Sequence, residues 1–157
     1  MRITLCSIGL TLIFPLAFLS SSAPSTVVLS TAHAGSAPHA SVVNVDDVTA
    51  LAPAHGKAQI KKLALGSNAF IGELTIKPGA KVPLHRDPTE EYLFVLSGGG
   101  TMTLNGKVHT VKKGDVIYMP AGSEVSFTNG NEVTRVMQVF AGPDPAAKYD
   151  QWKPVKD

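Results

Sequence analysis

The sequence predicts an all-β fold, an antiparallel sandwich or barrel, and three observations support this prediction. Among the 157 residues are 14 Gly and 11 Pro, few aromatic residues, and many of the Val, Ile and Thr residues that favour strands. From residue 59 onward, short apolar runs alternate with turn signals about every ten residues. No amphipathic helical pattern separates these runs. Closure into a barrel is favoured because it removes exposed strand edges.

Size and charge limit the functions open to the chain. A chain of this length fits one ordinary domain. Its 14 basic side chains nearly balance its 12 acidic ones, and only Lys61-Lys62 and Lys112-Lys113 are adjacent basic pairs. We therefore expect no nucleic-acid partner.

The first element is a predicted signal peptide, residues 1–34. Arg2 precedes the apolar run 3–19, and Ala32-His33-Ala34 supplies the small residues that a signal peptidase requires. We expect cleavage after this tripeptide, export to the periplasm or the medium, and no membrane contact afterwards. The intervening stretch 20–31 leaves the cleavage position open and keeps an uncleaved anchor as the alternative.

Residues 35–56 are expected to form a partly flexible leader. The part up to about residue 42 is small, polar and contains Pro, whereas residues 46–54 suit a strand or a short helical turn. Cleavage would also remove Cys6, the single cysteine, so no disulfide is available to the exported protein. Its stability must then come from burial of an apolar core.

The predicted barrel spans residues 57–142 and contains nine strand candidates. They lie near residues 59–65, 69–76, 81–86, 91–96, 101–104, 107–111, 115–119, 123–128 and 133–140. Pro78-Gly79 fits a type II turn, and Asn105-Gly106 fits a tight two-residue hairpin. These turns predict antiparallel pairing of the neighbouring strands.

Residues 143–157 are predicted to form a tail that packs on the barrel. Pro143 and Pro145 stop the last strand, and residues 146–152 suit one or two helical turns. These turns would lay Tyr149 and Trp152 on the barrel.

The residues with most chemical potential lie between the third and fourth strand candidates. On a strand, His85 and Asp87 point to the same face, because they are two residues apart. A turn then brings in Glu91, which shares its face with Leu93 inside the barrel, whereas Glu90 has the opposite parity and faces out. A polar cluster above an apolar floor is expected.

This stretch resembles the first motif of the cupin family, which is Gly, five residues, His-x-His, three or four residues, Glu, six residues, Gly. The matching residues are Gly79, His85, Glu91 and Gly98, with Asp87 in place of the second His. The second motif is matched by Gly114, Pro120, Gly122 and Asn129, with Val125 in place of its His. The resemblance covers residues 60–140 and implies a single-domain cupin, an antiparallel jelly-roll barrel that pairs as a homodimer through edge strands.

The resemblance also implies a metal site. In metal-binding cupins three His and one Glu hold Fe, Mn, Ni or Zn, and here His85, Asp87 and Glu91 would be the remaining ligands for one divalent ion. The alternative is a metal-free, hydrogen-bonded cluster at the barrel mouth, salt-bridged to Arg86 or Arg135. His109 points inward if its strand is regular and would then replace the missing ligand, or it faces solvent at a hairpin edge.

Two functional hypotheses follow, and the catalytic residues of the first are unknown. One is a metal-dependent small-molecule enzyme of the dioxygenase, lyase or isomerase type, with substrate entering over Tyr118, Val125 and Phe127. The other is a metal-free module that binds or senses a small ligand in the same cavity. A phosphate-binding loop and a nucleophile elbow are both absent from the sequence, so nucleotide hydrolysis and Ser-nucleophile chemistry have no support.

Overall fold

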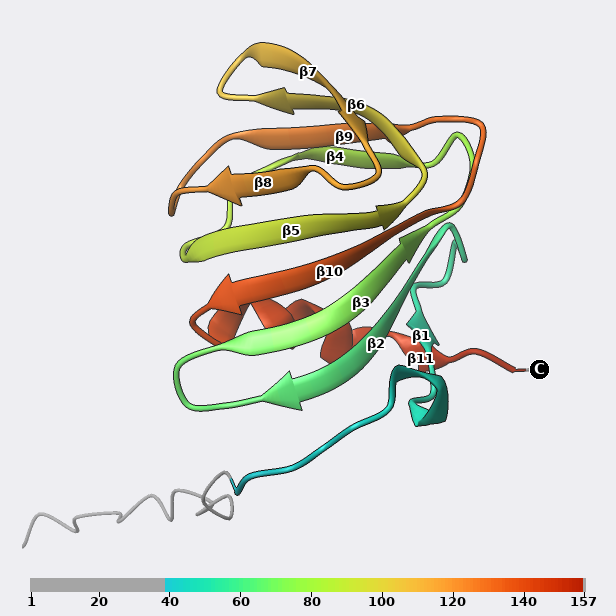
Figure 1. The fold of residues 1–157 in the computed structure, drawn as a ribbon, viewed down its shortest axis with the longest axis vertical. Helices are drawn as coiled ribbons and strands as arrows, with labels where there is room; N and C mark the ends of the chain where they lie inside the picture. The colour runs from blue at the N-terminus through green and yellow to red at the C-terminus, as the bar shows by residue number, and fades with distance from the viewer. Residues whose placement is uncertain (1–38, 157) are drawn as a thin grey trace, which may run out of the picture. The chain divides into compact units, whose positions relative to one another are not determined.

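The protein is described by a computed structural model of residues 39–156, and these residues form two antiparallel β-sheets (Figure 1). The predicted signal peptide, residues 1–34, lies outside the described residues. The elements are η1 (Val45–Asp47), β1 (Leu51–Ala52), β2 (Ala58–Leu65), β3 (Phe70–Ile76), β4 (Lys81–His85), β5 (Glu90–Ser97), β6 (Gly99–Leu104), β7 (Lys107–Lys112), β8 (Val116–Met119), β9 (Val125–Asn129), β10 (Thr134–Ala141), the 3-10 helix η2 (Asp144–Gln151) and β11 (Lys153–Pro154). None of the helices in residues 39–156 has the length and apolar character needed to span a bilayer.

The strand order is that of a jelly roll. The larger sheet runs β11-β1-β2-β3-β10-β5-β8, and the smaller one runs β4-β9-β6-β7. All nine predicted strands are present, each within two residues of its predicted bounds, and their pairings are antiparallel. The all-β jelly-roll prediction is therefore confirmed.

The predicted turns form for the expected reasons. Asn105 and Gly106 both have positive φ, 48° and 79°, as a two-residue hairpin turn between β6 and β7 requires. Gly79 has φ 65°, and the Ala80 N–H donates to the Lys77 carbonyl at 3.1 Å, closing the turn before β4. Glycine and asparagine tolerate these left-handed conformations with little steric cost.

The inner faces of the sheets build a core in two parts. In β5, Glu91, Leu93 and Val95 are buried while the residues between them are exposed, so this strand alternates as predicted. The larger part of the core lies between the two sheets and includes Val95 and Phe127. The smaller part is covered by η2, whose Tyr149 packs with Phe140 of β10 and is only 3% exposed.

The tail of the chain completes the larger sheet. Figure 1 shows η2 lying against β10 and β3, as the predicted packing of residues 143–157 requires. The Trp152 ring meets the Tyr149 ring edge-on at 4.9 Å, so it acts as a packing clamp. The larger sheet begins at Leu51, earlier than the expected boundary at residue 57, because β1 pairs with both β2 and β11.

Candidate functional site

The predicted cluster lies at one end of the barrel, where β4 meets β5. His85 is the last residue of β4 and stands opposite Val125 of β9. Its Nδ1 donates to the Pro83 carbonyl at 2.9 Å, and its Nε2 lies 3.7 Å from Asp87 Oδ2. The structure therefore brings His85 and Asp87 together, as their spacing predicts, at a partly solvent-accessible rim.

The cation of this cluster comes from η2. Lys148 Nζ donates to both carboxylate oxygens of Asp87, at 3.1 Å to Oδ2 and 3.3 Å to Oδ1. The same ammonium lies 4.6 Å from the centre of the Phe140 ring, which adds a cation–π contact. Sequence reasoning missed Lys148, because no local pattern connects a residue of the tail to the loop after β4.

The expected ion pairs of Arg86 and Arg135 with the cluster are wrong. Arg86 pairs with Glu124 and donates to the Gly122 carbonyl at 2.7 Å. Arg135 makes two hydrogen bonds to Glu73, at 2.7 and 3.1 Å. Along β10, Arg135 precedes the inward-facing Val136, so strand parity turns its guanidinium away from the cluster.

Behind the rim, a chain of buried polar side chains enters the core. The Tyr149 hydroxyl donates to Gln138 Oε1 at 2.6 Å, and Gln138 Nε2 donates to Glu91 Oε1 at 2.6 Å. All three residues are 5% exposed or less. Gln138 was missed by sequence reasoning, although its inward position between Val136 and Phe140 on an apolar strand was a usable signal.

Burial sets the protonation behaviour of this chain. Burial raises the pKa of the Glu91 carboxyl, against the smaller opposing effects of the Gln138 hydrogen bond and the Lys148 charge. Burial also raises the pKa of the Tyr149 hydroxyl, which therefore stays a hydrogen-bond donor at neutral pH. Glu91 is thus a carboxyl group with enhanced proton affinity beside an open rim.

The donor set does not fit a divalent metal ion in this arrangement. Both oxygens of Asp87 receive hydrogen bonds from an ammonium, and one oxygen of Glu91 receives one from an amide. Val125, opposite His85, has no atom that can ligate a metal. Across residues 39–156, no three His, Cys, Asp or Glu side chains are grouped so that they would hold a metal ion.

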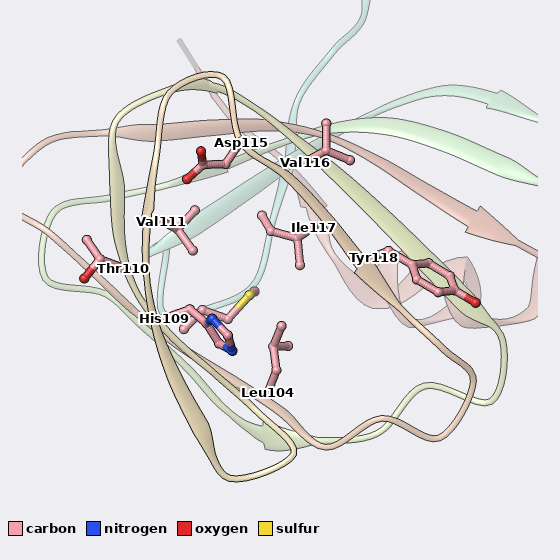
Figure 2. A pocket seen from close by; sticks show the side chains of 9 residues that line it. Leu104, His109, Thr110, Val111, Asp115, Val116, Ile117 and Tyr118 are labelled. Carbon is pink, nitrogen blue, oxygen red and sulfur yellow. The ribbon is translucent and has the colours of Figure 1, made fainter.

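A separate pocket, which we call the seam pocket, opens between β7 and β8 (Figure 2). These strands are the free edges of the smaller and larger sheets. The pocket has a volume of about 280 Å³. Met102, Val111 and Ile117 line its apolar floor, and its polar lining residues are Thr110, Asp115 and the exposed His109 (Figure 2).

The floor of the seam pocket is also a wall of the barrel interior. Met102, Val111 and Ile117 line a second void of about 30 Å³, together with Phe127 and other core residues. A void of this size is close to the volume that one water molecule occupies in liquid water. Methionine is the most adaptable of the three side chains, so Met102 is the residue best able to change this wall.

The residues predicted to line one pocket lie in three places. Tyr118 borders the seam pocket but belongs to the outer face of β8, where its ring stacks on Tyr92 and its hydroxyl donates to Glu90. Phe127 lines the inner void, and Val125 is part of the core between the sheets. Strand parity explains the separation, because Ile117 and not Tyr118 is the inward residue of β8.

His109 does not complete the cluster: it is exposed on the edge strand β7, the solvent-facing one of the two positions expected for it. It stands opposite the buried Met102 and shares its face with Val111, as strand parity predicts. The order β4-β9-β6-β7 puts His109 and His85 at opposite edges of the smaller sheet. Three strand spacings, roughly 14 Å, therefore separate their strands, too far for one ion.

Comparison with known proteins agrees with the fold. The cupin domain family model matches residues 72–140. An uncharacterized protein of Methanocaldococcus jannaschii is 35% identical over 74 residues, 46% of this chain and 59% of that protein. The dimethylsulfoniopropionate lyase DddW of Ruegeria pomeroyi is 28% identical over 94 residues, 57% of this chain and 62% of the lyase. The chain thus spans about three fifths of the length of each of these two relatives.

Solved structures of other proteins share this architecture. A predicted oxalate decarboxylase from Thermotoga maritima has a TM-score of 0.60 at 24% identity, covering 65% of this chain and 99% of its own. The polyketide cyclase RemF from Streptomyces resistomycificus has a TM-score of 0.60 at 20% identity, covering 76% of this chain and 87% of its own. The solved structures share the fold, and the match to the cupin family model, together with the jelly-roll topology and the two sequence motifs, shows that the chain belongs to the cupin family.

Proposed function

We propose that this cupin binds a small organic molecule in the seam pocket and does so without a metal ion. The observation that carries the proposal is the pocket itself, an apolar floor with an imidazole, a carboxylate (Asp115) and a hydroxyl (Thr110) beside it, open between two free strand edges. Its volume of about 280 Å³ is just below the range of about 300–1,000 Å³ for small-molecule sites, so a small ligand is expected.

The lining indicates the chemical class of the ligand. Met102, Val111 and Ile117 offer an apolar surface to an aliphatic or aromatic body. His109 offers a nitrogen donor or acceptor to one polar group of the ligand. The edge strands β7 and β8 each have a paired neighbour on only one side, so their backbone groups can add hydrogen bonds.

Relatives support a small-molecule ligand without identifying it. The names dimethylsulfoniopropionate lyase, oxalate decarboxylase and polyketide cyclase each refer to a reaction of small organic molecules. These names belong to proteins that share the fold or part of the sequence. For this chain they favour a screen of small acids and small aromatic compounds.

A ligand screen with two matched variants tests the proposal. Fragments are screened by thermal shift and by NMR against the wild-type protein, His109→Trp and Val108→Trp. His109→Trp fills the pocket and should abolish binding, whereas Val108, exposed on the opposite face of β7, tolerates the same change with binding intact. Hits that bind all three proteins equally would refute the seam pocket as the binding site.

A second candidate function, proton-transfer catalysis, is favoured by Glu91. Its carboxyl is buried, its pKa is raised by burial, and it lies beside the rim formed by His85, Asp87 and Lys148. We propose that a compound which binds at this rim, and not in the seam pocket, would be converted there, with Glu91→Gln removing turnover but not binding. Binding without turnover in the wild-type protein would restrict the chain to a binding role.

We also propose that the chain is exported. The support is the order of charged, apolar and small residues in residues 1–34. Mass spectrometry of the mature N-terminus tests this, with cleavage after Ala34 expected. An intact N-terminus in the membrane fraction would instead indicate an uncleaved anchor.

A further inference from the structure

We infer that the Lys148 ammonium is the resident cation of the His85, Asp87 and Glu91 cluster, and that it keeps divalent metal ions out of this site. The inference concerns the barrel end and is independent of ligand binding in the seam pocket. It assigns to the C-terminal tail a role in the chemistry of the barrel, beyond its role in covering the core.

The ammonium is held by several contacts. It donates to both oxygens of Asp87, at 3.1 and 3.3 Å, and lies 4.6 Å from the centre of the Phe140 ring. Its contacts in the cluster are therefore with the Asp87 carboxylate and the Phe140 ring.

The backbone that carries Lys148 is anchored in the core. The next residue, Tyr149, is 3% exposed and hydrogen-bonds to Gln138, and Ala146 of the same helix is 2% exposed. The backbone is therefore fixed before the ion pair forms, and the lysine side chain, which is 38% exposed, is the part that has to be ordered to reach Asp87. The ion pair is thus built into the fold of the tail.

An ammonium and a divalent ion compete for the same carboxylate. A metal ion bound by His85, Asp87 and Glu91 would have to displace the Lys148 ammonium from Asp87. The ammonium would still repel the ion, because the anchored helix keeps Lys148 nearby. Removing the charge while keeping the aliphatic stem would leave the cluster with two carboxylates, one imidazole and no cation. As they stand, the three side chains are not grouped closely enough to hold an ion, so binding also requires Asp87, once freed from Lys148, to turn toward Glu91. One imidazole and two carboxylates are then a donor set that suits Zn²⁺ or Mn²⁺, with water in the open positions.

Lys148→Met makes this change, and Lys62→Met is its matched control. Lys62 also pairs with an acidic residue of η2, since its Nζ lies 2.7 Å from Asp150 Oδ1, but Asp150 is exposed and takes no part in the cluster. Lys148→Arg keeps the positive charge. Far-UV circular dichroism and thermal melting establish that each variant is folded.

The measurement is metal content by elemental analysis after equilibration with Zn²⁺ or Mn²⁺ and gel filtration, supported by calorimetric titration. Lys148→Met should retain close to one ion per chain, and the wild-type protein, Lys62→Met and Lys148→Arg should retain almost none. Adding Glu91→Ala to Lys148→Met should remove the gained ion.

Two outcomes would overturn the inference. One is a wild-type protein that retains a near-stoichiometric ion, because Lys148 then does not exclude metal. The other is a folded Lys148→Met protein that gains none, because the ammonium then does not stand in a cation site. Neither outcome alters the fragment screen on the seam pocket, so the two proposals fail separately.

Discussion

Tyr149→Phe should destabilise the protein through a single lost hydrogen bond. The substitution removes the hydroxyl that donates to Gln138 Oε1 at 2.6 Å and keeps the ring, whose centre lies 5.9 Å from that of Phe70 and 4.9 Å from that of Trp152. Gln138 is 3% exposed, so its carbonyl oxygen would lose its donor without gaining water. Leaving a buried acceptor unsatisfied costs about 1–3 kcal/mol.

The matched control for this prediction is Tyr92→Phe. It removes a hydroxyl that donates to Glu90 at 2.9 Å from a side chain that is 38% exposed, so water can replace it. The expected cost is less than about 0.5 kcal/mol. The free energy of unfolding is measured in urea by circular dichroism and by the fluorescence of the single Trp, Trp152. Equal unfolding free energies for the two variants would refute the buried hydrogen-bond chain.

Three further predictions follow from the geometry. Burial raises the pKa of Glu91 above its usual 4.5, so the folded state binds this proton more tightly than the unfolded state does. The free energy of unfolding of the wild-type protein should therefore fall, relative to that of Glu91→Gln, as the pH rises from 4.5 through the raised pKa. Melting curves across this range check this, and a pH-independent difference would contradict it. Gly99→Ala would place a Cβ 2.1 Å from a backbone carbonyl oxygen of β7, and we expect it to lower the free energy of unfolding in urea by about 3 kcal/mol or more. Gly106→Ala is the control, because its Cβ meets open space and only the positive φ is unfavourable, which should cost about 1 kcal/mol. Similar losses of unfolding free energy in the two variants would show that Gly99 does not lie this close to the backbone of β7. Val125→His in the Lys148→Met background adds an imidazole opposite His85 and should tighten Zn²⁺ binding at least about tenfold by calorimetry, whereas unchanged affinity would mean that the new ring does not face the cluster.

Most of the fold could be predicted because its signals are local. Alternating apolar residues and glycine-containing turns mark the nine long strands, and parity correctly places Glu91 inside and Glu90 outside. The two-residue strand β11 could not be predicted, since two residues carry no periodicity, whereas β1 falls within residues 46–54, where a strand or a short helical turn was expected. They exist because the tail returns to the start of the larger sheet.

The candidate site was predicted only in part, because its partners come from distant segments. The spacing of His85, Asp87 and Glu91 identified the cluster. Lys148 reaches it through the packing of η2, which depends on tertiary structure. The seam pocket likewise depends on which strands become the free edges of the two sheets. The expected homodimer stays a prediction, and analytical ultracentrifugation of the purified protein would test it.

We propose that a lysine is the cation of the barrel end. Anomalous diffraction from crystals of Lys148→Met and of the wild-type protein, both soaked in Zn²⁺, shows whether a metal ion can take its place. We expect an anomalous peak among His85, Asp87 and Glu91 in the variant and none at that position in the wild-type protein. A zinc peak there in the wild-type protein, or no peak in a folded variant, would contradict it.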